Sequence, residues 1–198
     1  MASARTRHHE TDAGNARGGG KAEAACRSGW AWILFLAAAA AGAAADLATK
    51  HVAFARLMDR SDQSVTVIPD ILALRLSTNP GVVGGLMGGQ SVLILLANLA
   101  AVVAVVALFA LSSRRFRALQ VALGMILGGA VGNMYDRLLV RIDIPGRHEP
   151  LTGVVRDFID LHAGPYHWPT FNVADILLVV GVGLFILHAF RHRSRKAG

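Results

Sequence analysis

The chain has few charged side chains and a single cysteine, and both shortages are informative. Only 17% of its 198 residues are Asp, Glu, Lys or Arg, whereas 54% are hydrophobic. This balance argues against a soluble globule and indicates one domain of a membrane protein. The lone cysteine, Cys26, excludes a framework of disulfide bonds.

The sequence also lacks the signatures of several enzyme classes. It has no His-Glu-x-x-His motif for a metal and no Gly-x-Ser-x-Gly or Ser-x-x-Lys motif for a serine nucleophile. His148, His162 and His167 fall in one loop but lack metal-site spacing. We therefore expect no metal ligands and no cofactor. No long-period repeat is visible, which disfavours an inverted-repeat transporter.

Four apolar runs are present, and crossing a bilayer takes about 20 such residues. They cover Trp30 to Ala45 with a continuation towards Phe54, Ser91 to Leu111, Ala118 to Tyr135, and Phe171 to Phe190. Because the bilayer core offers no water to the backbone, these runs must be helical. Alternating residues at 65–68 and 72–76 predict short strands between the first two helices. The predicted fold is an all-α membrane protein with four transmembrane helices and a small extracytoplasmic β-sheet and loop region.

Basic residues are distributed unevenly along the chain. The segments 1–27, 112–117 and 191–198 hold 12 Lys or Arg and three acids, whereas the remaining loops and helix ends hold 8 basic and 10 acidic residues. The positive-inside rule then predicts that both termini are cytoplasmic. We expect a disordered cytoplasmic tail at 1–27, a four-helix domain at 28–192 and a basic cytoplasmic tail at 193–198. The positive charge reflects orientation and contact with inner-leaflet lipids, so we expect no nucleic-acid partner.

Acidic residues lie at the ends of these apolar runs, on the side predicted to face outwards. An acid there is costly and is therefore a functional hypothesis. Asn133 precedes Asp136, and Asn172 precedes Asp175, by three residues, so each Asn shares a helix face with its Asp and can donate to it. Asp175 also lies at the N-terminus of the predicted fourth helix. Its negative charge could be there only to stabilise the helix through its dipole.

Paired carboxylates suggest a reaction. Two carboxyl groups at close range can share one proton, so that one activates water while its protonated partner polarises a carbonyl. The neighbouring residues also permit structural ion pairs. Arg137 follows Asp136 directly and is its expected partner, and Asp46 and Lys50 share a helix face at i, i+4. Arg156 adjoins Asp157 and could lower the pKa of that carboxyl group.

With these residues in view, the chain resembles lipoprotein signal peptidase, or signal peptidase II, the bacterial membrane aspartyl protease family. The resemblance covers roughly residues 30 to 190. It rests on Asp46-x-x-Thr49-Lys50, Asn79-x-Gly81, Gly128-Gly129-Ala130-x-Gly132-Asn133-x-x-Asp136-Arg137, Gly153-x-Val155-x-Asp157-Phe158 and Phe171-Asn172-x-Ala174-Asp175. Two features depart from the family: 141–152 looks like an insertion, and Arg156 stands where a small apolar residue is usual.

The resemblance implies an aspartic endopeptidase of the cytoplasmic membrane with its active site at the outer face. Asp157 and Asp175 would be the catalytic pair. The residues that would support the site or contact substrate are Asp46, Lys50, Asn79, Gly129, Asn133, Asp136, Arg137 and Asn172. The implied partners are membrane lipids and a diacylglyceryl prolipoprotein, which is cut just before its lipidated cysteine. We expect a monomer.

Two other functions use the same features. A small proton-coupled transporter or channel component could employ the acids as a relay, but relay residues should be spread along a path near the bilayer midplane. A structural membrane scaffold would leave the two Asn-x-x-Asp motifs unexplained.

Overall fold

The structure is a computed structural model that describes residues 23–81, 90–144 and 148–194. Four helices dominate it, and each is long and apolar enough to cross a membrane. They are α1 (Gly29–Met58), α2 (Gln90–Leu111), α3 (Arg117–Leu139) and α4 (Val173–Ser194). The four predicted helices are therefore confirmed, with α1 continuing four residues past the predicted end.

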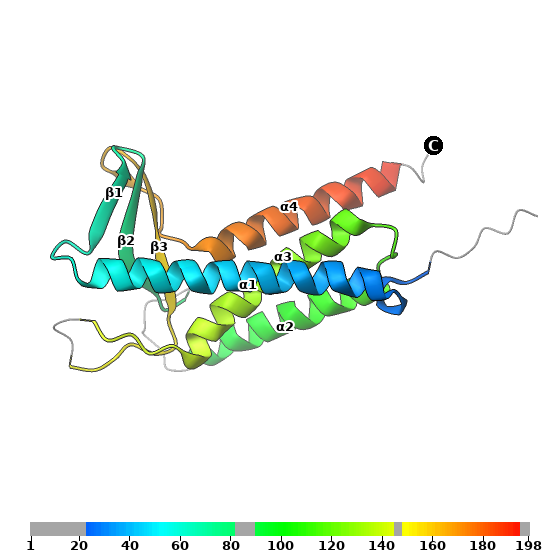
Figure 1. Cartoon of the computed structure of the whole chain (residues 1–198), viewed down its shortest axis with the longest axis horizontal. Helices are drawn as coiled ribbons and strands as arrows, with labels where there is room; N and C mark the ends of the chain where they lie inside the picture. The colour runs from blue at the N-terminus through cyan, green and yellow to red at the C-terminus, as the bar shows by residue number, and fades with distance from the viewer. Residues whose placement is uncertain (1–22, 82–89, 145–147, 195–198) are drawn as a thin grey trace, which may run out of the picture.

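Helix α3 lies at the centre of the bundle and contacts each of the other three helices (Figure 1). It has the lowest mean hydropathy of the four, 1.3, yet it is the most buried. Small residues explain this placement. A Cβ atom on Gly124 would come within 2.5 Å of the Phe35 carbonyl oxygen, and one on Gly128 within 2.6 Å of the Ala39 carbonyl oxygen. The glycines thus let α1 and α3 approach to backbone contact.

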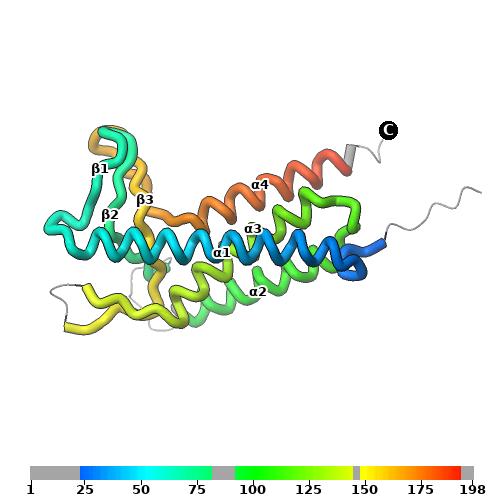
Figure 2. The backbone as a smooth tube through the Cα atoms, viewed as in Figure 1, coloured from blue at the N-terminus to red at the C-terminus, as the bar shows by residue number. Residues whose placement is uncertain are grey.

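A four-stranded antiparallel sheet lies at one end of the bundle (Figure 2). Its strands follow the order β1 (Ser64–Ile68), β2 (Leu72–Asn79), β3 (Val155–Ala163) and β4 (Tyr166–His167). The two strands predicted from alternation are confirmed as β1 and β2. Strand β3 was not predicted because Arg156, Asp157 and Asp160 interrupt its apolar pattern, although all three are buried.

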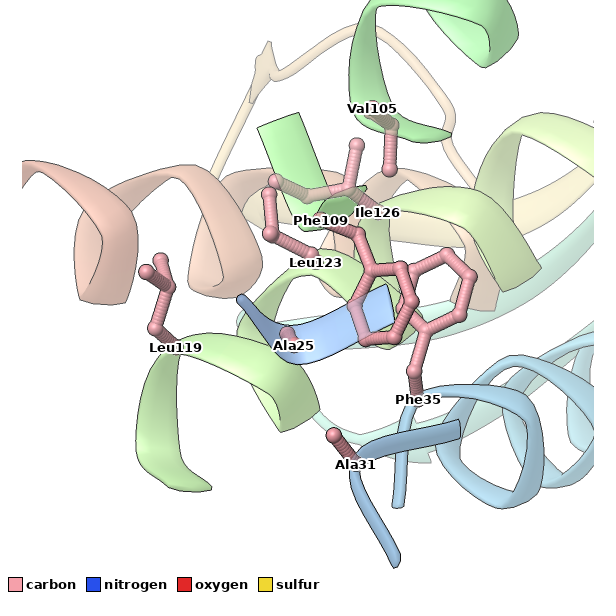
Figure 3. Packing of buried hydrophobic residues seen from close by; sticks show 8 residues of the cluster. All are labelled: Ala25, Ala31, Phe35, Val105, Phe109, Leu119, Leu123 and Ile126. Carbon is pink, nitrogen blue, oxygen red and sulfur yellow. The ribbon is translucent and has the colours of Figure 1, made fainter. Parts of the chain in front are cut away.

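Two apolar clusters close the ends of the bundle. Beneath the sheet, Phe54, Leu57 and Phe158 belong to a cluster that packs α1 against β3. At the other end, the rings of Phe35 and Phe109 stack with their centroids 4.3 Å apart (Figure 3). The second cluster joins α1, α2 and α3, so the polar residues of the site lie in a layer between two apolar ends.

The first described residues pack on the bundle. The short 3-10 helix Ala25–Arg27 begins with a fully buried alanine whose N–H donates to the Ser112 carbonyl oxygen at 2.8 Å. Glu23 forms an ion pair with Arg114 at 2.8 Å. Residues 23–27, just before the predicted boundary at residue 28, therefore pack on the four-helix bundle. The rest of the predicted N-terminal tail, residues 1–22, and most of the predicted C-terminal tail lie outside the described residues.

The expected insertion at 141–152 is described at both of its ends. There, Ile142 and Leu151 exchange two backbone hydrogen bonds of 3.0 and 2.9 Å, and Ile142 is buried. The ends of this segment are thus paired with each other and packed on the domain.

Candidate active site

Asp175 lies in the first turn of α4, and Asn172 precedes the helix. The Asp175 N–H donates to Asn172 Oδ1 and the Asn172 N–H donates to Asp175 Oδ2, both at 3.1 Å. This reciprocal pair satisfies two N–H groups that the helix itself leaves unpaired. Asn172 and Asp175 are thus in contact at the predicted spacing, but through backbone N–H donors and not through the predicted donation from the Asn172 side-chain amide. The contact fixes the direction of the Asp175 carboxylate.

Asp157 lies on β3 and is only 1% exposed. Its Oδ1 accepts a hydrogen bond of 2.6 Å from Asn172 Nδ2. The Asn79 side chain, at the end of β2, provides a second hydrogen bond to the carboxylate. Two amide side chains, one from the end of β2 and one from the segment before α4, thus hold Asp157 in place.

Asn172 and Asn133 connect the two carboxylates. Asn172 contacts Asp157 through its side chain and Asp175 through its backbone N–H. Asn133, on α3, donates to Asp175 Oδ1 at 3.1 Å and accepts from Asn172 at 3.2 Å. The fold therefore brings Asp157 and Asp175 into one hydrogen-bonded group.

The pKa of Asp157 is raised to about 6, chiefly by burial. The Asn172 hydrogen bond lowers this pKa, and the neighbouring charge of Asp175 adds to the increase. The expectation that Arg156 lowers this pKa is wrong. The Arg156 guanidinium instead bonds to Asp136, at 2.6 Å from Nη2 and 3.1 Å from Nε to the same oxygen. Asp157 is therefore suited to hold a proton at pH values where an ordinary aspartate is ionised.

This raised pKa should make stability depend on pH. The folded protein binds a proton at Asp157 more tightly than the unfolded chain does, so the stabilisation is complete below pH ~4 and is lost as pH rises through about 6. The stability lost should approach about 3 kcal/mol, because the folded and unfolded pKa values differ by roughly two and each pKa unit corresponds to 1.36 kcal/mol. Melting temperatures of the wild type and Asp157→Asn should be measured in detergent from pH 4 to 8. As the pH rises, the wild type should lose stability relative to the variant. Parallel curves would contradict the assignment.

Lys50 and Asp46 are both fully buried on α1, as an i, i+4 pair 2.7 Å apart. Lys50 Nζ also donates to Asn133 Oδ1 at 2.8 Å and lies 3.4 Å from Asp136 Oδ2. The other Asp46 oxygen accepts the Ala174 N–H at 2.9 Å. The predicted pair is thus confirmed, and it joins α1 to α3 and to the first turn of α4.

Asp136 is fully buried, but its partner is not the predicted Arg137. It bonds to Arg156 through the guanidinium and, at 2.9 Å, through the backbone N–H. Consecutive helix residues point about 100° apart, so Asp136 and Arg137 cannot face each other. Arg137 instead interacts electrostatically with Asp157 and Asp175 as well as Asp136, and its Nε is buried without a hydrogen-bond partner among the described residues.

The remaining predicted site residue, Gly129, has a packing role. A Cβ atom there would lie 2.6 Å from the Ala174 carbonyl oxygen. This close approach seats the start of α4 against α3, directly below Asp175. On the same side of α3, a Cβ on Gly132 would overlap the Asp46 carboxylate. Glycine at both positions therefore leaves room for the polar layer.

Sequence reasoning missed two contributors to this layer. The Ala174 backbone N–H carries no signal in its side chain, and only its place in the first turn of a helix marks it as a free donor. Arg156 was noted as unusual, but its partner is 20 positions away in the chain. Asp136 was the available signal for Arg156, because a buried carboxylate needs a positively charged partner.

An apolar cavity of about 340 Å³ opens beside Asp175. Its other lining residues are apolar and come from β3, the segment after β4, and α4: Leu161, Trp168, Phe171, Ile176, Val179 and Val180. A larger cavity of about 830 Å³ lies between α1 and the sheet. Asp175 is thus the polar end of an otherwise hydrophobic pocket.

Residues 38–191 match the family model described as signal peptidase (SPase) II. The chain belongs to this family. The lipoprotein signal peptidase of Sulfurihydrogenibium sp. (strain YO3AOP1) is 31% identical over 157 residues, which cover 76% of this chain and 87% of that protein. The lipoprotein signal peptidase of Symbiobacterium thermophilum is 36% identical over 144 residues, covering 72% and 85%.

The fold of this family member is also similar to solved structures. A bacterial membrane enzyme solved by the in meso method at 2.3 Å resolution aligns with a TM-score of 0.63 and 27% identity. The alignment covers 85% of this chain and 92% of that one. The four long apolar helices and the small antiparallel sheet of this chain thus form a fold similar to that of a solved bacterial membrane enzyme.

Proposed function

We propose that this chain is an aspartic endopeptidase that removes the signal peptide from diacylglyceryl prolipoproteins and cuts just before the lipidated cysteine. The observation that carries the proposal is the joining of Asp157 and Asp175 by Asn172 within a buried polar layer. Membership of the signal peptidase II family supports the substrate class. The relatives named above are lipoprotein signal peptidases.

In the proposed reaction Asp157 carries the proton and Asp175 is the base. Ionised Asp175 takes a proton from water as the water oxygen bonds to the scissile carbonyl carbon, and Asp157 gives its proton to the carbonyl oxygen. The tetrahedral intermediate then loses its C–N bond. The leaving nitrogen takes the proton held by Asp175, and a hydroxyl proton of the intermediate returns to Asp157. The raised pKa of Asp157 supports this division of roles.

The surroundings of the pair support a lipid-bearing substrate. Trp168 and Val179 line the cavity beside Asp175 and are 70% and 73% exposed in the isolated chain. Val179 lies on α4, and exposed apolar surface on a membrane-spanning helix faces lipid, so a substrate that lies in the bilayer can reach Asp175 sideways. We propose that this cavity holds apolar substrate next to the scissile bond.

For localisation we propose the bacterial cytoplasmic membrane, with both termini cytoplasmic and the site at the outer face. The basic segment 112–117, the start of α1 and the end of α4 lie at the end of the bundle remote from the sheet (Figure 1). The positive-inside rule assigns that end to the cytoplasm. The site acids gather at the sheet end, and this supports the protease over a proton relay, which needs a path through the membrane.

The direct test uses the full chain in detergent with a synthetic prolipoprotein peptide whose cysteine carries diacylglycerol. Mass spectrometry should detect release of the signal peptide with cleavage just before the modified cysteine. The matched control is the same peptide with an unmodified cysteine, which should be cut far more slowly. Equal cleavage of both peptides would refute the lipid requirement, and an intact lipidated peptide would refute the proposed function.

A further inference from the structure

A second polar cluster lies on the hairpin of β3 and β4, apart from the catalytic pair. It consists of Asp160, His162 and His167, each of which offers one ligand atom, and these atoms lie within 4.8 Å of one another. His162 and His167 are cross-strand partners, and their rings stack with centroids 5.0 Å apart. The spacing in the sequence gave no sign of this cluster, because the strand register creates it.

Strand geometry separates this cluster from the active site. Asp160 and His162 are two residues apart on β3, so they share one face of the strand. Asp157 is three residues before Asp160 and belongs to the opposite face. A ligand bound by the cluster would therefore not contact the catalytic carboxylate.

Existing contacts engage two of the three candidate ligands of the cluster. His167 Nδ1 lies 2.9 Å from Asp160 Oδ1, and the exposed end of Arg75 contacts Asp160 Oδ2 at 3.1 Å. His162 Nδ1 is buried and has no hydrogen-bond partner among the described residues. A buried polar nitrogen without a partner calls for an explanation, and a bound ion is a recognised one.

We propose that Asp160, His162 and His167 bind a divalent transition-metal ion of the Zn²⁺ class. Two imidazoles and a carboxylate suit Zn²⁺, which accepts nitrogen and oxygen ligands and can take water in its fourth position. Ca²⁺ and Mg²⁺ prefer oxygen ligands alone and fit this set poorly. The buried, fully unexposed Asp160 supplies the negative charge that the ion needs.

The bound ion would fasten the hairpin that forms one wall of the apolar cavity. Trp168 follows His167 directly, and its N–H donates to the Leu161 carbonyl oxygen at 2.8 Å. Both Trp168 and Leu161 line the cavity beside Asp175. Because His162 and His167 come from the two strands, a shared ion holds Trp168 in position. Arg75 competes with the ion for Asp160. In the metal-free hairpin, Arg75 therefore remains the positively charged partner of Asp160.

A calorimetric titration tests the proposal. Zn²⁺ alone is added to the full chain in detergent after treatment with a chelator. We expect binding at this cluster to weaken at least tenfold in His162→Ala and in His167→Ala, since even outer-shell changes at metal sites cost about 10–100-fold. The Arg75→Gln variant should bind Zn²⁺ more tightly, because Arg75 competes with the ion for Asp160. His148→Ala changes an exposed histidine outside the cluster and is the matched control. A His188→Ala, His192→Ala double variant removes two histidines of α4 that lie next to each other. Both controls should bind as the wild type does.

Binding of equal strength in the wild type and in His162→Ala or His167→Ala would overturn the proposal. So would loss of binding in the α4 double variant. Melting temperatures in chelator check that the variants fold. A second measurement needs no variant at all. Co²⁺ bound to the wild type should show the intense visible bands of a four-coordinate site with paramagnetically shifted histidine signals, whereas the weak bands of a six-coordinate aqueous ion would overturn the proposal.

Discussion

Asp157→Asn and Asp175→Asn should each reduce cleavage of a lipidated prolipoprotein peptide by roughly 10²–10⁴-fold, the range expected when a general acid or base is lost. Asparagine keeps the size of the side chain and can still meet Asn172, but it neither takes a proton from water nor supplies an acidic one. In the proposed mechanism the two carboxylates act together, so the double variant should be no slower than the slower single variant. Single-turnover rates on the purified full chain measure this.

The matched control is Asp70→Asn. Asp70 is an exposed acid at the turn between β1 and β2, and its positive φ of 60° is one that asparagine adopts equally well. This variant should cleave at the wild-type rate. If a folded Asp136→Asn protein were inactive while Asp157→Asn kept substantial turnover, the catalytic pair would have to be reassigned to Asp136 and Asp175.

Lys50→Met should destabilise the protein by about 3–5 kcal/mol, the cost of removing one partner of a buried ion pair. Lys50 Nζ lies within 3.4 Å of both Asp46 and Asp136, so its loss leaves two buried carboxylates short of a positive charge. Methionine preserves most of the side-chain volume, so the effect reports charge and not packing. Thermal unfolding in detergent should reveal a large fall in melting temperature.

Two further variants isolate the ion pair. Adding Asp46→Asn to Lys50→Met should cost less than the sum of the two single changes, because the lysine and the carboxylate are in direct contact. Arg60→Met removes one partner of an exposed pair, with Asp62, and should change stability by less than about 1 kcal/mol. Strict additivity in the first case would show that Asp46 and Lys50 contribute independently.

Local spacing predicted the parts of this molecule that local geometry controls. The i, i+4 spacing of Asp46 and Lys50 and the i, i+3 spacing of Asn172 and Asp175 both correspond to observed contacts. Apolar length predicted the four helices, and alternation predicted β1 and β2.

The interpretations that were wrong concern residues whose partners are distant in the chain. Asp136 meets Arg156 because β3 crosses the end of α3, and adjacency to Arg137 in the sequence was misleading. Strand β3 itself stayed hidden because its charged residues are buried by tertiary contacts that no short window contains. The pairing of His162 with His167 depends on a two-residue turn and its register in the same way.

The bond from the Ala174 N–H to Asp46 joins residues 128 positions apart. It lies at the point where the first and last helices meet below Asp175, so the polar layer cannot be completed while the chain is still emerging from the ribosome. A nascent chain that has not yet extended to α4 lacks both Asn172 and Asp175. On the proposed mechanism such a chain cannot cleave its substrate, so activity begins only when α4 has been inserted.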